Sequence, residues 1–283
     1  MSVAASHRID VRHLFPEERA AFLALLTDLT NEDWHRPTVC TGWSVHDLAV
    51  HLLGIDVQLL SGGRDGFGGP PNQAPADDLS DWDTLVAFID GRNAAWVDAT
   101  RRVSPRLVRE FLAFTGELVS TYLATIDMDA PTIPVSWLSP EPAPTWLHIA
   151  REYTERWVHH QQIRDAAGRP GFTEPRFFAP VLAAFARALP HALRGTLAPP
   201  GTIVRLVITG PAGGTWTTLR DHDRWQLADD YTTPAAATVT LDQDLAWRLF
   251  TKGVDPAVAE GAIQIDGNRA LAAPVAHMVT IMA

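Results

Sequence analysis

The sequence has little cysteine, almost no lysine and no long apolar run. Its one cysteine, Cys40, allows no disulfide within the chain, which is typical of proteins in a reducing compartment. The N-terminus lacks the apolar core of a signal peptide, and no stretch reaches the roughly 18 apolar residues that a membrane span needs. We therefore expect a cytoplasmic protein with no membrane partner.

Basic residues are scarce and scattered. The chain carries 23 basic against 33 acidic residues, its formal net charge is −10, and it has no run of Lys and Arg. Binding to nucleic-acid phosphates needs a concentrated basic surface, so we expect no nucleic-acid partner. Hydrophobic residues make up 46% of the 283 positions, which is enough for the core of one large domain or two ordinary ones.

The two parts of the chain differ in their periodicity. In the first part apolar residues recur at helical spacing between loops rich in Pro and Gly, and SVHD at residue 44 has the pattern of a helix-capping box. The stretch 129–144 contains too much Pro for a regular helix. Helices are predicted at residues 16–30, 44–60, 79–102, 104–126 and 145–167.

The second part begins with a predicted helix at 176–194 and continues with segments of strand character, such as TIVRLVITG and ATVTLD. A short helix ending at Gly253, a further strand and a closing helix over NRALAAPVAHMVTIMA are expected after them. The predicted fold class is therefore α + (α+β), with an all-helical domain at 1–170 and an α+β domain at 171–283.

Polar residues take an unusual position in the last helix of the first part. They follow one another at steps of four, three, four and three, the spacing that the buried apolar stripe of a helix normally has. Two interpretations remain open from spacing alone: a side that faces water, or a polar site inside a bundle. The residues of this stripe are His148, Glu152, Glu155, His159 and Gln162.

Two of these residues can form a metal site with a histidine from the second helix. Glu155 and His159 are four residues apart and can converge on one point, and His51 lies at the edge of a predicted apolar stripe that contains Leu48 and Leu52. Such a set suits Zn²⁺ with an open fourth position, and Ni²⁺ or Fe²⁺ as alternatives. Gln162 and Glu152 could contact the ligands or the substrate.

Other histidines fit this site less well. His46 is predicted to face water, and His160 is interpreted as a surface residue because it points elsewhere on the helical wheel. His148 lies nearly three turns from His159, which is too far for one ion.

The sequence resembles a known family in three segments. Residues 34–54, WHRPTVCTGWSVHDLAVHLLG, and 152–171, EYTERWVHHQQIRDAAGRPG, are similar to two signatures of the mycothiol-dependent maleylpyruvate isomerases, which belong to the DinB-like metal-binding four-helix bundles. The segment from residue 237, which begins ATVTLDQDLAWRLFTKG, resembles the sterol-carrier-like domain often fused to that bundle. Carried over by these motifs, the metal ligands are again His51, Glu155 and His159.

The resemblance implies an enzyme that uses mycothiol, a low-molecular-weight thiol of actinobacteria, for isomerisation or S-transfer on a small electrophile. An anionic substrate would need a cation, for which Arg248, Lys252 and Arg164 are candidates. The alternative for each is a surface charge without a role in the site. Alternatives are a non-catalytic metal-containing binding protein and a DinB-like metal-dependent hydrolase. We expect a monomer or a homodimer.

Overall fold

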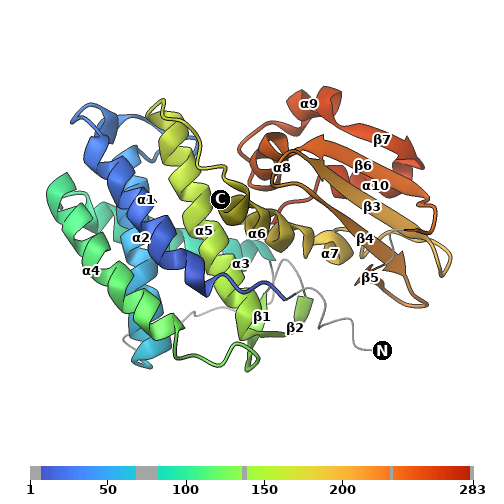
Figure 1. Ribbon diagram of the computed structural model, residues 1–283, viewed down its shortest axis with the longest axis horizontal. Helices are drawn as coiled ribbons and strands as arrows, with labels where there is room; N and C mark the ends of the chain where they lie inside the picture. The colour runs from blue at the N-terminus through green and yellow to red at the C-terminus, as the bar shows by residue number, and fades with distance from the viewer. Residues whose placement is uncertain (1–7, 68–81, 136–138, 230–231, 281–283) are drawn as a thin grey trace. The chain divides into compact units, whose positions relative to one another are not determined.

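A computed structural model describes residues 8–67, 82–135, 139–229 and 232–280. The first part of the chain folds into long helices, as predicted (Figure 1). None of the helices in the described residues is long and apolar enough to cross a membrane. The main helices of this part are α1 (Phe15–Asp28), α2 (Val45–Gln58), α3 (Trp82–Thr100), α4 (Pro105–Leu123) and α5 (Thr145–Ala166), with short η1 (Arg12–Leu14), η2 (Asp33–His35) and a π-helical turn, η3 (Leu59–Arg64).

The start of α2 is fixed by the predicted capping box. The Ser44 side chain accepts a hydrogen bond from the backbone N–H of Asp47, and the Asp47 carboxylate accepts one from the backbone N–H of Ser44 at 2.9 Å. Burial alone would raise the pKa of Asp47, but hydrogen bonds from Arg101 and Ser44 lower it overall. Two otherwise unpaired N–H groups are thereby satisfied at the end of the helix that carries His51.

The Pro-rich stretch before α5 forms a hairpin instead of a helix. Strand β1 (Pro131–Val135) pairs antiparallel with β2 (Ser139–Pro144), with irregular register. Pro lacks the N–H that a regular ladder needs, which accounts for an interrupted pairing. The backbone N–H of Thr145 then donates to the carbonyl of Ala130 at 2.9 Å, so that α5 begins directly beside the hairpin.

The C-terminal part is an α+β fold, as predicted. Its five-stranded sheet has the order β5-β4-β3-β6-β7, in which β3 and β6 are parallel and the other pairs are antiparallel. Helices α8 and α10 pack against β3 and β6. The elements are α6 (Pro175–Ala186), α7 (Leu189–Ala192), β3 (Ile203–Thr209), β4 (Gly214–Arg220), β5 (Trp225–Ala228), β6 (Ala237–Asp242), α8 (Gln243–Phe250), α9 (Pro256–Ala259), η5 (Glu260–Ala262), β7 (Gln264–Gly267) and α10 (Arg269–Ala276).

Two predicted helices in this part are shorter than expected. The helix predicted at 176–194 breaks into α6 and α7, because Pro190 has no N–H to bond to the carbonyl four residues earlier. The closing helix ends at Ala276, and the chain turns so that the Thr280 N–H donates to the Phe250 carbonyl at the end of α8, at 3.0 Å. The last three residues of that prediction lie outside the described residues.

The chain divides into two compact units. One comprises residues 12–127 and 156–171, and the other comprises residues 1–11, 128–155 and 172–283. The division falls inside α5, which is one continuous helix through residues 155 and 156. The domain boundary predicted at residue 170 stays a prediction.

A buried ion network joins four helices of the bundle. Asp56 of α2 is fully buried, and its carboxylate accepts hydrogen bonds from both terminal nitrogens of Arg19 of α1, at 2.7 and 3.0 Å. It also accepts from Arg156 of α5 at 3.0 Å and from the hydroxyl of Thr115 on α4 at 2.7 Å. Burial alone would raise the pKa of Asp56, but the two guanidinium groups lower it overall, so the carboxylate is ionised.

The path of Arg19 to this network depends on a glycine. A Cβ at Gly116 of α4 would lie 2.8 Å from Cγ of Arg19, which is closer than non-bonded carbons approach. The absence of a side chain at this position lets the arginine pass against the backbone of α4, where one of its terminal nitrogens also donates to the carbonyl of Leu112 at 2.6 Å.

We expect Asp56→Asn to lower the free energy of unfolding by about 3–5 kcal/mol, because two buried guanidinium groups would lose their counterion. Urea denaturation followed by circular dichroism measures this effect. Asp98→Asn is the matched control: Asp98 also pairs with an arginine, Arg101, but its side chain is 79% exposed, and its loss should hardly move the midpoint. A similar small effect for both variants would contradict the role given to Asp56.

Candidate metal centre

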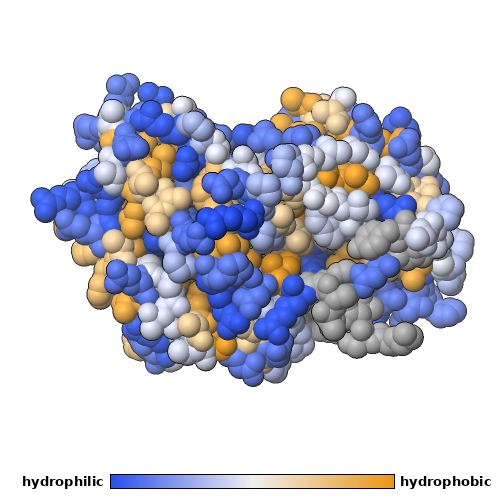
Figure 2. Space-filling model, viewed as in Figure 1, coloured by the Kyte–Doolittle hydropathy of each residue, from blue (hydrophilic) through white to orange (hydrophobic). Residues whose placement is uncertain are grey.

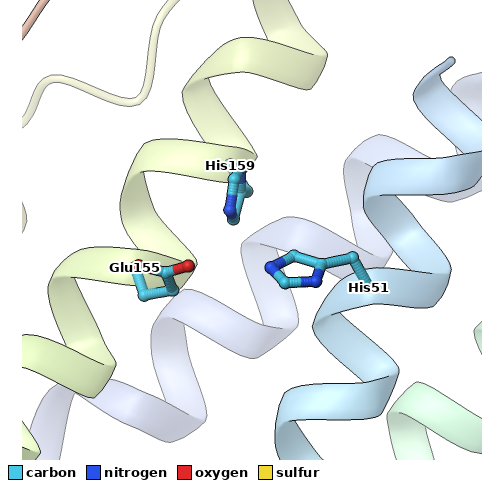
Figure 3. A group of neighbouring side chains, drawn as sticks. All are labelled: His51, Glu155 and His159. Carbon is cyan, nitrogen blue, oxygen red and sulfur yellow. The ribbon is translucent and has the colours of Figure 1, made fainter. Parts of the chain in front are cut away.

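Two helices bring the predicted metal ligands together. His51 comes from α2, and Glu155 and His159 come from successive turns of α5, so that their side chains point into the same space (Figure 3). One ligand atom of each residue lies within 4.8 Å of those of the other two. The three residues that spacing and resemblance both predicted therefore form one cluster.

The cluster is largely shielded from solvent. His51 and His159 are each 4% exposed, and Glu155 is half-buried. The two imidazole rings stand at 89° to one another with their centroids 4.9 Å apart. The indole of Trp43 packs beside the imidazole of His51, with the ring centroids 5.0 Å apart, and gives His51 an apolar neighbour.

The amide of Gln162 orients one of the ligands. Its Oε1 lies 2.7 Å from Nδ1 of His159, three residues earlier on α5, and it also accepts a hydrogen bond from the Cys40 thiol at 3.3 Å. An amide oxygen accepts, so Nδ1 carries the hydrogen and Nε2 of His159 keeps its lone pair for a metal ion. Cys40, a free cysteine, is half-buried and adjoins this pair.

The donor set fits a divalent metal ion. Donors that each lie about 2.0–2.2 Å from one ion are at most about 4.4 Å apart. A cluster within 4.8 Å can reach this geometry when the side chains close by less than an ångström. Two imidazoles and one carboxylate match the sets that hold catalytic Zn²⁺, with a position left for a further ligand, and also suit Ni²⁺ or Fe²⁺.

The remaining predicted site residues have other contacts. Glu152 is half-buried and pairs with Arg151 at 3.0 Å. Arg164 donates to Nε2 of His160 at 2.9 Å and to the carbonyl of Pro170 at 2.9 Å. Burial lowers the pKa of Arg164, an effect that Glu18 partly offsets. The roles predicted for Glu152 and Arg164 in binding the thiol or the substrate stay predictions.

The two candidate cations of the C-terminal part lie on α8 and just after it. Arg248 donates to Asp244 at 3.0 Å, and its guanidinium stacks on the ring of Trp247 at 4.4 Å from the centroid. Lys252 is exposed and has a positive φ of 59°, in the left-handed region where glycine is usual at a helix end. The part that either plays in binding a substrate stays a prediction.

The predicted solvent exposure of two histidines was wrong. His160, interpreted as a surface residue, is completely buried, and its Nδ1 lies 2.9 Å from Glu18 of α1. Burial lowers the pKa of His160, and the Glu18 carboxylate offsets part of this shift. His46 is half-buried instead of facing water, and its Nε2 lies 2.7 Å from the Val103 carbonyl.

The fold and this largely shielded His–Glu–His cluster define a helical bundle with a candidate metal site, joined to an α+β part. Residues 15–164, more than half of the chain, match the family described as the mycothiol maleylpyruvate isomerase N-terminal domain. The chain belongs to this family, as its two signature segments indicated. No curated protein matches the sequence.

One solved structure shows the same fold over most of the chain. The crystal structure of the mycothiol-dependent maleylpyruvate isomerase is similar over 90% of this chain and 91% of that chain, with a TM-score of 0.52 and 11% sequence identity. Its histidine-to-alanine mutant gives a TM-score of 0.49 at the same coverage and identity. The sterol carrier protein domain 2 of Helicoverpa armigera covers 38% of this chain and 89% of its own, at 17% identity, with a TM-score of 0.26.

We expect the purified protein to bind about one Zn²⁺ per chain, and His51→Ala and His159→Ala to bind none, because two donors rarely hold Zn²⁺. Elemental analysis after loading with Zn²⁺ and gel filtration measures this content. His46→Ala and His148→Ala are matched controls on the same two helices and should keep the metal. Wild-type protein without metal after this treatment would overturn the site.

We expect Gln162→Leu to bind Zn²⁺ about 10–100-fold more weakly, because Nδ1 of His159 loses its acceptor and the ring loses its fixed orientation. Competition with a chromophoric chelator gives the dissociation constant. The neighbouring Gln161→Leu, also buried, tests whether any change at this level of α5 has the same effect. Equal losses in both variants would argue for a general packing effect instead of an oriented ligand.

Proposed function

We propose that this protein is a metal-dependent enzyme that uses a low-molecular-weight thiol, such as mycothiol, to isomerise or modify a small electrophile. The observation that carries the proposal is the shielded His51–Glu155–His159 cluster within a chain of this family. Zn²⁺ held by this set would lower the pKa of a thiol in its open position, so that the thiolate forms at neutral pH.

The residues of the chain would prepare the site for this chemistry. The carboxylate of Glu155 balances part of the charge of a divalent ion, and Gln162 keeps Nε2 of His159 turned toward it. The indole of Trp43 beside His51 excludes water from one side of the cluster. In such a sheltered site the interactions between charges are stronger than in water.

The two reactions differ in the fate of one carbon–sulfur bond. In isomerisation the thiolate adds to a conjugated cis double bond, the new single bond rotates, and elimination restores the double bond as trans together with the free thiolate. No net oxidation occurs, and the thiol is regenerated. In S-transfer the carbon–sulfur bond is kept, and the carbanion formed beside it takes up a proton from solvent. Family membership favours isomerisation of a compound such as maleylpyruvate.

An anionic substrate would need cations, for which we propose Arg248 and Lys252 of the C-terminal part. Arg248 is half-buried and held by Asp244, and Lys252 has no ion-pair partner among the residues that the structure describes. If they bind the substrate carboxylate, Arg248→Ala and Lys252→Ala should raise KM for the substrate and leave KM for the thiol unchanged.

We expect Zn²⁺-loaded protein to convert maleylpyruvate to its trans isomer only when mycothiol is present. The change in absorbance of the substrate measures this reaction. His159→Ala should reduce the rate to that of the thiol alone, and His148→Ala should keep the wild-type rate. Replacing Zn²⁺ with Co²⁺ gives a second readout, since a bound thiolate adds a charge-transfer absorption band.

The outcome separates the alternative functions. Turnover of ester or amide substrates without thiol, and no cobalt–thiolate band, would overturn the thiol proposal in favour of a hydrolase. Binding of thiol without turnover of any electrophile would favour a metal-containing binding protein.

A further inference from the structure

Helix α4 has two apolar sides, and one of them lies at the surface. Val108, Leu112 and Val119 are buried where α4 packs against α1 and α2. A second row of apolar side chains is turned away from that core. Leu107 is 42% exposed, Phe111 45% and Phe114 63%, and Leu118 of the same row is half-buried.

This second row, which we name the α4 outer stripe, consists of Leu107, Phe111, Phe114 and Leu118. Its steps of four, three and four place the side chains within about 60° of one another around the helix. Apolar residues reach the surface at the left of Figure 2, where Figure 1 places α4. A row of large apolar side chains at this spacing is the pattern of a helix that packs against another helix.

The order of residues along the stripe is symmetric. Read from either end it is Leu, Phe, Phe, Leu, with the same steps in both directions. A two-fold axis through the middle of the stripe therefore places Leu107 against Leu118 of a second copy, and Phe111 against Phe114. Contacts across a two-fold axis must be self-complementary, and this stripe meets that condition in an antiparallel pair.

The charges beside the stripe favour the same arrangement. Arg106 and Glu117 lie on one flank, at opposite ends of the stripe. The side chain of Arg106 is 81% exposed and reaches Glu110 at 2.8 Å, and Glu117 is exposed with no ion-pair partner among the described residues. An antiparallel pair brings Arg106 of each copy toward Glu117 of the other, so that opposite charges meet at both ends of the stripe.

We propose that the α4 outer stripe is a homodimer interface in which two copies of α4 pack antiparallel about the point between Phe111 and Phe114. The proposal is independent of the function proposed above. Four apolar side chains from each copy form a small interface core, and small interfaces are typical of reversible association. We therefore expect a dissociation constant on the order of micromolar.

Sedimentation velocity over a concentration series tests the proposal. Wild-type protein should shift from monomer to dimer with rising concentration, and Phe114→Glu should raise the dissociation constant at least about thirty-fold, the loss expected of a central interface residue. Phe67→Glu is the matched control, because Phe67 belongs to the same unit, is 65% exposed and lies outside the stripe. Circular dichroism and zinc content confirm that each variant is folded.

The charged flank gives a second test. Arg106→Glu alone should weaken the dimer, because it faces Glu117 of the other copy. The double variant Arg106→Glu/Glu117→Arg exchanges both charges and should restore most of the wild-type association. A double variant no better than the single one would contradict the antiparallel register.

Cross-linking reports the orientation. In a Cys40→Ser background, Ala113→Cys lies about 1.5 Å along the axis from its own counterpart in an antiparallel pair, and Thr121→Cys lies about 25 Å from its counterpart. Ala113 points away from the stripe, so a bifunctional thiol reagent must span about 15 Å. It should link the former and not the latter, whereas a parallel pair would link both. A protein that stays monomeric at about 100 μM, or a dimer unaffected by Phe114→Glu, would overturn the proposal.

Discussion

The helical bundle depends on the ionised carboxylate of Asp56. It holds Arg19 and Arg156 at once, and each of these arginines comes from a different helix. A buried ion network of this kind adds little net stability compared with an apolar core, but it tolerates few alternative arrangements, because any shift of one helix would leave a charge unpaired. Its value to the site is positional. Asp56 follows His51 by five residues on α2, and Arg156 adjoins Glu155 on α5, so the same ion pairs that join the helices also fix the level at which their candidate metal ligands meet.

Around this network the polar residues of α5 fall into two groups with different contacts. Glu155, His159 and Gln162 serve the candidate metal centre, and Arg156 and His160, turned to other directions, contact buried carboxylates of α2 and α1. One helix is thus polar over much of its circumference and yet largely buried. Arg156 and His160 have partners on neighbouring helices, and His159 has one on α5 itself. Such hydrogen-bonded partners are the condition under which polar groups can be buried without a large loss of stability.

The sequence was sufficient for most of the helices, for the strands of the C-terminal sheet and for the proximity of His51, Glu155 and His159, because these depend on local spacing. Glu155 and His159 are one turn apart, and the pattern around Ser44 indicates where α2 begins, so that the direction of His51 follows from the periodicity of its own helix. The environment of His160 could not be predicted in this way. Its partner Glu18 is 142 positions earlier in the chain, and a charged residue in the first turn of α1 gives no sign that it will face inward. Buried polar pairs between distant helices depend on how the helices pack, which spacing within one helix does not reveal.

The composition of the basic residues has a consequence for labelling. Of the 23 basic side chains, 22 are guanidinium groups and one is the primary amine of Lys252. Reagents that acylate side-chain amines therefore have a single target, and it is exposed at the C-terminal end of α8, on a residue whose backbone has a left-handed conformation. Once the α-amine of the chain is blocked, a fluorophore placed there without any substitution would report from one defined point of the C-terminal part, four residues after the arginine that stacks on Trp247.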